Sequence, residues 1–156
     1  MLYLQYNYKN MDKANLLLLN ELAKANGLVS FVVAKLLKEH KMDFRCHDAY
    51  DIEYERNEDD NWQPTDNYTL SGIYYGESNL DDRNFYLAPM LTTVLERLWV
   101  KDQISIAVST SKADIYQKGI HKATYQIGPQ YSDSYWNAMM YILEMTLTNK
   151  QLKFNI

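Results

Sequence analysis

Two segments near the N-terminus carry apolar residues at the spacing of an amphipathic helix. The first, 12–26, opens on Asp12 as a capping residue, has its leucines between positions 16 and 22, and is followed by Gly27. The second has five apolar residues at positions i, i+3, i+4, i+7 and i+8, which are Val29, Val32, Val33, Leu36 and Leu37. We therefore expect a helical hairpin in which this stripe is mostly buried.

The apolar period changes to that of a strand after these two helices. Between positions 50 and 55 an apolar residue alternates with a carboxylate at every step. This pattern predicts a strand at 50–56 with one apolar face and one acidic face. A polar loop at 57–67, which contains Pro64, leads to a second predicted strand at 68–75. We expect the two strands to pair as a hairpin.

The C-terminal half contains two further helices and two further strands. Pro89 opens a helix at 90–99, because proline is tolerated in the first turn. Alternating apolar residues predict strands at 104–110 and 122–128. Either Ser132 or Asp133 caps a last helix at 133–147.

These elements predict an α+β fold with the element order ααββ-αββα. A chain of 156 residues has the usual size of one domain, and no linker interrupts it. We therefore expect a single domain over residues 1–156. Its four strands are predicted to form one largely antiparallel sheet with helices packed on it.

Charge is distributed unevenly along the chain. Residues 48–82 contain eleven carboxylates and one arginine, a net charge of −10, whereas residues 1–47 and 83–156 each carry +3. A field of one sign speeds the encounter with an oppositely charged partner and helps to select it, and tryptophan is a frequent anchor at interfaces. The candidate partner-binding residues are Asp51, Glu53, Glu55, Glu58, Asp59, Asp60 and Trp62. The alternative is a solvated acidic surface without a partner, since repulsion between carboxylates is weak in salty water.

The reactive side chains form no recognisable catalytic or metal-binding pattern. Cys46 and His47 are adjacent on an extended segment, so their side chains point to opposite faces. Ser109 and Lys112 match the short S-x-x-K pattern without its partner motifs. We expect no catalytic residues, no metal, no cofactor and no enzymatic activity.

Cysteine usage and hydropathy bear on the compartment. The chain has one cysteine, no signal-peptide pattern and no apolar run near the ~20 residues that a membrane helix needs. We expect a cytoplasmic protein without a membrane partner.

A helix-turn-helix unit is one alternative for the N-terminal helices. Ala23, Gly27 and Val33 have a spacing that resembles this DNA-binding motif. Five positions would face bases, and only two of them, Ser30 and Lys35, can form hydrogen bonds with bases; the other three are Val29, Phe31 and Ala34. Direct binding of nucleic acid is therefore not expected, and a DNA-binding regulator stays a second alternative.

Several short runs resemble a group of small proteins from phages and prophages of Bacteroidetes. The runs are Ala34-Lys-Leu-Leu-Lys-Glu-His, Cys46 with Tyr50-Asp51, Tyr86-Leu-Ala-Pro89 and the C-terminal helix from Tyr135 to Leu147. The resemblance covers about residues 34–148. It implies a mobile element as the setting, with the host-cell cytoplasm as the location, and no particular activity.

The charge pattern and this setting together give the expected function. We expect a non-enzymatic inhibitor of a host defence system, similar in kind to anti-CRISPR proteins, that acts by protein–protein binding. Its expected partner is a basic nucleic-acid-handling host protein, such as a defence nuclease complex, that binds the acidic surface. The first alternative is a structural or assembly protein of a phage that forms a homodimer.

Overall fold

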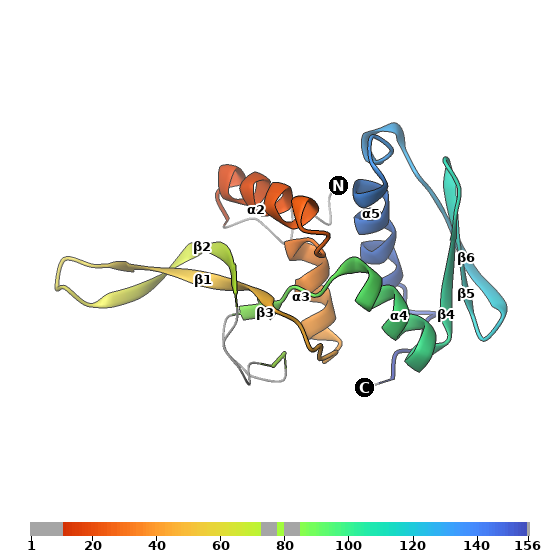
Figure 1. Cartoon of the computed structure of the whole chain (residues 1–156), viewed down its shortest axis with the longest axis horizontal. Coiled ribbons are helices and arrows are strands. Elements are labelled where there is room, and N and C mark those ends of the chain that lie inside the picture. Colours follow the sequence, from red (N-terminus) through yellow and green to blue (C-terminus); the bar gives the residue numbers. More distant parts are fainter. Residues whose placement is uncertain (1–10, 73–77, 80–84, 156) are drawn as a thin grey trace. The chain divides into compact units, whose positions relative to one another are not determined.

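The computed structural model describes residues 11–72, 78–79 and 85–155 of the chain. The chain divides into two compact units, Met1–Pro89 and Met90–Ile156. The described residues form four α-helices and two three-stranded antiparallel sheets (Figure 1). The α+β class expected from the sequence is confirmed, whereas the single domain over 1–156 stays a prediction.

The prediction of one four-stranded sheet is wrong. In the first unit the strand order is β2 (Trp62–Gly72), β1 (Asp48–Arg56) and β3, and in the second it is β4 (Ile104–Val108), β5 and β6 (Ile120–Gln126). The expected order ααββ-αββα therefore gains one strand in each half. Two strands were missed, β3 (Phe85–Leu87) and β5 (Lys112–Gln117). Each of them pairs with strands of its own unit, and β5 separates the two strands that the pattern did predict there.

The two N-terminal helices form where their caps and apolar spacing place them. Helix α2 (Lys13–Ala25) begins after Asp12, whose carboxylate accepts a hydrogen bond from the Ala14 N–H at 2.9 Å. Helix α3 (Phe31–Glu39) begins after Ser30, which caps it through its hydroxyl. The predicted burial of the apolar stripe is confirmed, since all five of its side chains are buried: Val29, Val32, Val33, Leu36 and Leu37.

The first sheet is built around β1 (Asp48–Arg56), which pairs with β2 (Trp62–Gly72) on one side and with β3 on the other. Strand β2 begins inside the segment 57–67 that was predicted as a loop. Pro64 is compatible with this position, because an edge strand has backbone groups that no neighbouring strand needs. Positions 73–75 of the predicted second strand lie outside the described residues.

An aromatic cluster joins the sheet to α3. The Phe31 ring lies 5.5 Å from the Tyr50 ring, 4.7 Å from the Tyr68 ring and 5.4 Å from the Tyr86 ring, measured between centroids. Buried Tyr50 also donates a hydrogen bond from its hydroxyl to the Val29 carbonyl at 2.6 Å. Aromatic pairs at such separations add stability beyond the area that they bury, so the base of the β1–β2 hairpin is firmly held.

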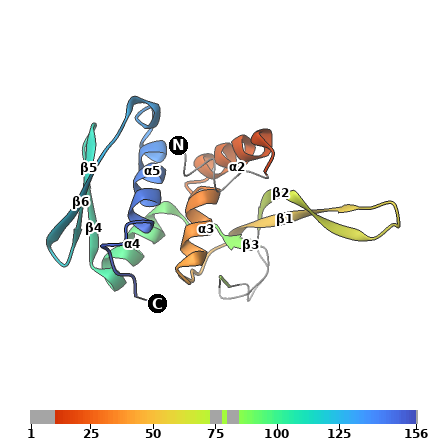
Figure 2. The same cartoon turned by 180° about the vertical axis from the view of Figure 1, so that it is seen from behind.

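The second unit places two helices beside one sheet. Helix α4 (Leu91–Asp102) leads into β4 (Ile104–Val108), and β5 and β6 (Ile120–Gln126) complete the sheet before a 3₁₀ turn and helix α5 (Tyr135–Leu147). Both helices lie on the same side of the sheet (Figure 2). The core side of the sheet carries Ile104, Ala113 and Ile115, all of which are buried.

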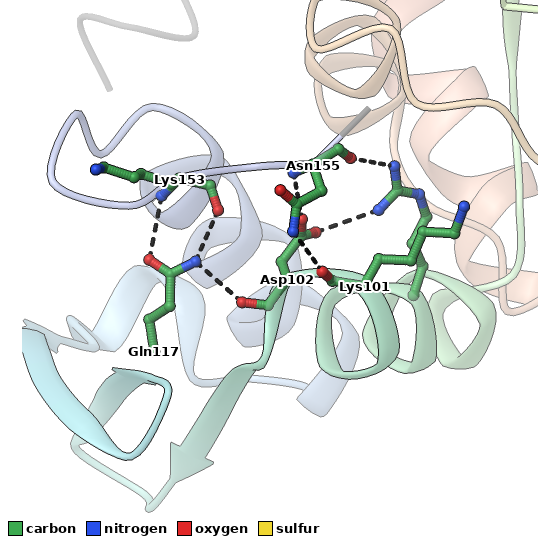
Figure 3. Close-up of polar contacts among 6 residues, drawn as sticks. Lys101, Asp102, Gln117, Lys153 and Asn155 are labelled. Atoms are coloured by element: carbon green, nitrogen blue, oxygen red, sulfur yellow. Dashed lines mark hydrogen bonds and ion pairs between the residues drawn. The ribbon is translucent and has the colours of Figure 1, made fainter.

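Polar contacts tie residues 153–155 to α4 and β5 (Figure 3). The Gln117 amide donates to the carbonyls of Asp102 at 3.0 Å and Lys153 at 2.7 Å, and it accepts from the Lys153 N–H at 3.1 Å. The buried Asp102 carboxylate forms an ion pair with Arg97 at 3.2 Å and accepts from the Asn155 N–H at 2.6 Å. The buried polar groups of this corner are therefore partnered, as a stable interior requires.

Candidate functional site

The outer part of the β1–β2 hairpin projects away from α2 and α3, as both views of the chain show (Figures 1 and 2). We call residues 51–69 the arm. Between positions 53 and 64 every residue except Asn57 is exposed. This outer part of the arm lacks the packing that the base has, and its side chains are available to another molecule.

A bulge divides the arm into two segments. Ile52 pairs with Tyr68, but Tyr54 pairs with Pro64, so that Glu53 lies opposite the three residues 65–67. The Thr65 hydroxyl stabilises the irregularity by donating to the Glu53 carbonyl at 2.9 Å. Bulges change the direction and twist of a strand pair, and this one marks where the exposed outer segment begins.

The predicted binding residues do not share one face of the arm. Successive side chains of a strand point to opposite faces, which puts Asp51, Glu53 and Glu55 together on one face. Trp62 pairs with Arg56 across the ladder, so it lies on the opposite face, the one that contacts α3 at the base. Trp62 is 64% exposed there. The acidic part and the aromatic part of the candidate surface therefore lie on opposite faces of the arm.

The three remaining candidates lie at the tip of the arm. Glu58, Asp59 and Asp60 are exposed in the turn between β1 and β2. The Asn57 side chain holds this turn by accepting hydrogen bonds from the N–H groups of Asp59 and Asn61, both at 3.0 Å. Glu58 and Asp59 therefore project from an ordered turn.

Arg56 connects the tip to the aromatic face. Its guanidinium forms an ion pair with Asp60 at 2.9 Å and lies 5.1 Å from the centre of the Trp62 ring. One of the six candidate carboxylates therefore has a cation beside it. Residues 48–72 nevertheless hold eight carboxylates against this single arginine, a net charge of −7.

Cys46 and His121 are the strongest candidates for chemistry outside the arm. Cys46 belongs to the first unit and His121 to the second. Burial raises the pKa of the Cys46 thiol, which is the opposite of what activates a nucleophilic cysteine.

His121 forms a polar cluster with Asp114 and Thr124 that the sequence pattern did not indicate. Its Nε2 atom lies 3.2 Å from an Asp114 carboxylate oxygen and 2.9 Å from the Thr124 hydroxyl. The hydrogen bond from Thr124 is the main cause that lowers the pKa of Asp114. In a catalytic triad the acid and the nucleophile contact different nitrogens of the histidine. Here one nitrogen contacts both groups, so the cluster lacks the geometry for a proton relay.

The described part of the chain shows neither a metal-binding cluster nor a membrane-spanning helix. Within it, no group of three or more His, Cys, Asp or Glu side chains is placed to hold a metal ion. Its helices are all too short or too polar to span a bilayer. The arm is therefore the candidate site with the most distinctive geometry.

The chain was also compared with known proteins. Models of protein families, curated proteins and solved structures gave no match to it.

Proposed function

We propose that this chain is a non-enzymatic binding protein that inserts its arm into a basic groove of a nucleic-acid-handling protein. The observation that carries the proposal is the net charge of −7 on residues 48–72, most of which form an exposed two-stranded projection. A host-defence nuclease complex is the favoured partner, in keeping with the resemblance to proteins of phages. The chain would then act as an inhibitor of the anti-CRISPR kind.

The mechanism is occlusion of a site that phosphates would otherwise occupy. Asp51, Glu53 and Glu55 occur at alternate positions of β1, so neighbouring carboxylates are spaced by about 7 Å along the strand. Lysines and arginines that contact phosphates in a groove can instead form ion pairs with this row. The field of the arm also attracts such a groove before contact, which speeds association.

The two faces of the arm favour insertion over docking on a flat surface. A flat partner would contact either the row Asp51, Glu53 and Glu55 or Trp62, because the row and the tryptophan lie on opposite faces. A groove contacts both faces at once, with basic side chains on one wall and an apolar pocket for Trp62 on the other. Tyr54, which is 53% exposed, extends the aromatic face.

Two observations weigh against the alternatives that involve catalysis or DNA. The raised pKa of Cys46 and the contacts of His121 supply no activated nucleophile. In the helix-turn-helix interpretation Phe31 would face bases, yet its ring packs against Tyr50, Tyr68 and Tyr86.

The test compares two variants with the same change of charge. In the first, Asp51→Asn, Glu53→Gln and Glu55→Gln remove three carboxylates from the arm. In the second, Glu21→Gln, Glu39→Gln and Glu96→Gln remove three exposed carboxylates from helices. Both chains and the wild type are used to capture proteins from a host lysate at low and high salt. Captured nucleic-acid-handling proteins are then assayed for nucleic-acid binding.

At low salt the arm variant should associate with the partner at least about tenfold more slowly than the wild type, because it has lost three charges that attract the partner. The helix variant should behave like the wild type. The partner should also lose nucleic-acid binding when the wild-type chain is present. Equal capture by the two variants, or a partner that still binds nucleic acid in the complex, would contradict the proposal.

A third variant, Trp62→Ala, tests the aromatic wall. Truncation of an interface anchor raises the dissociation rate more than it lowers the association rate. Trp62→Ala should therefore shorten the lifetime of the complex, whereas the carboxylate variant slows its formation. If Trp62→Ala changes neither rate, the partner contacts one face only and insertion into a groove is wrong.

A further inference from the structure

Strand β4 lies at an edge of its sheet, and its backbone hydrogen bonds show which groups are unpaired. The Lys118 N–H donates to the Gln103 carbonyl at 3.0 Å, and the Ser109 N–H donates to the Lys112 carbonyl at 2.9 Å. Bonded and non-bonded pairs alternate in an antiparallel ladder. The pairing continues without a shift between these two bonds. Every second residue of β4 therefore bonds to β5, and these residues are Ser105 and Ala107.

The other three residues of β4 therefore direct their N–H and carbonyl groups to the open edge. These residues are Ile104, Ile106 and Val108. Within the described chain, no hydrogen bond outside the ladder satisfies them. An open row of donors and acceptors is a template for another strand.

The other edges of the two sheets carry features that discourage such pairing. Strand β2 contains Pro64 and Asp66, and β3 has only three residues. Strand β6 carries Lys122, and its pairing with β5 is irregular beside Tyr116. Proline, charged residues, bulges and short length are the usual means of protecting an edge. Among the described strands, β4 alone combines an open edge with none of them, since its sequence is ISIAV.

An apolar groove runs along the same edge. It has a volume of about 180 Å³ and is lined by the side chains of all three open-edge residues together with Leu95 and Trp99 of α4 and Tyr135 and Met139 of α5. Trp99 is 60% exposed and Tyr135 is 64% exposed. These exposed aromatic side chains beside an open strand edge are available to a second molecule.

We propose that β4 pairs in antiparallel fashion with β4 of a second copy of this chain, about a two-fold axis at Ile106. Ile104 of each copy then lies opposite Val108 of the other, and each of the three residue pairs exchanges two hydrogen bonds. The two sheets become one continuous sheet of six strands. The apolar side chains of both strands point to the same face, so each copy covers part of the groove of the other.

A second copy is the occupant that fits this edge best, for reasons of symmetry and charge. An antiparallel pair about a two-fold axis always places donors opposite acceptors, so β4 is complementary to itself. It contains no charged residue, and self-pairing therefore brings no like charges together within the strand. The pairing uses only three residues of a five-residue strand from each copy, so we expect a dimer that dissociates on dilution. The proposal rests on no residue of the arm, so failure of one proposal leaves the other standing.

The first test measures the mass of the full chain by sedimentation over a wide range of concentration. The wild type should change from monomer to dimer as its concentration rises. Val108→Lys places an ammonium group at the open edge and should raise the dissociation constant at least about tenfold, because the charge would lose water without gaining a partner. Ile120→Lys is the matched control, since Ile120 is an exposed isoleucine on the opposite edge strand. It should leave the dimer unchanged.

The second test uses wild-type chain alone and does not depend on the folding of a variant. Amide exchange at Ile106 and Val108 should slow as the concentration rises, whereas Ser105 and Ala107 should be protected at every concentration by their bonds to β5. A chain that stays monomeric up to its solubility limit overturns the proposal. A dimer that Val108→Lys leaves intact also overturns it. The same holds if the β4 amides become protected only when a different protein, found in a capture experiment, supplies the strand.

Discussion

The side-chain amide of Asn15 takes the place of a neighbouring strand for Tyr68. It donates to the Tyr68 carbonyl at 2.9 Å and accepts from the Tyr68 N–H at 3.0 Å. An amide side chain carries the same donor and acceptor as a peptide group, so Asn15 closes the outer edge of β2 at the base of the arm. Gln117 makes the same two-way contact with the backbone of Lys153 in the second unit.

Asn15→Ala should destabilise the first unit by about 1–3 kcal/mol, because it leaves a partly buried donor and acceptor without partners. Urea unfolding measures this change. Lys13→Ala, at an exposed position of the same helix, should change the free energy of unfolding by less than about 0.5 kcal/mol. Equal effects of the two substitutions would show that the Asn15 contact contributes nothing.

Tyr50→Phe should cost about 1–3 kcal/mol of unfolding free energy. The ring and its contact with Phe31 remain, but the buried Val29 carbonyl loses the hydroxyl that bonds to it at 2.6 Å. Thermal and urea unfolding both measure the effect. Tyr54→Phe is the control, because the Tyr54 ring is more than half exposed on the arm. A change at Tyr50 no larger than that at Tyr54 would contradict the assignment.

Arg97→Met should destabilise the second unit by about 3 kcal/mol. The Asp102 carboxylate is completely buried and would lose its cation, and an unpaired buried charge is costly. Lys101→Met is the control, since Lys101 contributes only its backbone carbonyl to this corner. If the two methionine variants unfold at the same denaturant concentration, the ion pair is not a stabilising contact.

Glu144→Gln should stabilise the protein at neutral and alkaline pH. Burial raises the pKa of Glu144 to about 7, so the folded state keeps a proton that the unfolded chain releases at lower pH. The stabilising contribution is present below the unfolded pKa and is lost as the pH rises through about 7. The wild type should therefore lose stability relative to Glu144→Gln between acid and neutral pH. The measurement is the urea midpoint of each protein across this pH range. Glu96→Gln, at an exposed position, is the control and should follow the wild type.

The sequence pattern identified the helices well, because their caps and apolar stripes are local features. Asp12 caps α2 as predicted, and α4 ends three residues beyond its predicted end. The predicted cap of the last helix, Ser132 or Asp133, was wrong, because Ser134 caps α5 through its hydroxyl. Strand β5 was missed because its core-facing positions are Ala113, Ile115 and Gln117, of which only Ile115 is strongly apolar. That glutamine is buried because it bonds to the backbone of Lys153, 36 residues away, and no local pattern reveals such a partner.

The residues of the candidate site were predictable from charge, but their arrangement was not. The run from Asp51 to Glu55 alternates visibly, and the structure places it on a strand. The position of Trp62 depended on whether Pro64 ended the strand or lay within it. Only the pairing of Arg56 with Trp62 shows that the tryptophan and the carboxylates face opposite ways.

The bulge opposite Glu53 has a consequence for how such a protein can evolve. On the inner side, the pairing of Ile52 with Tyr68 is fixed by the aromatic cluster, and a slip of one residue would turn Tyr50 out of the core. Beyond the bulge a new register begins at Tyr54, and no side chain of this outer segment is buried. Substitutions and changes of length at the tip can accumulate there under selection by a changing partner, while the base keeps its register and the fold persists.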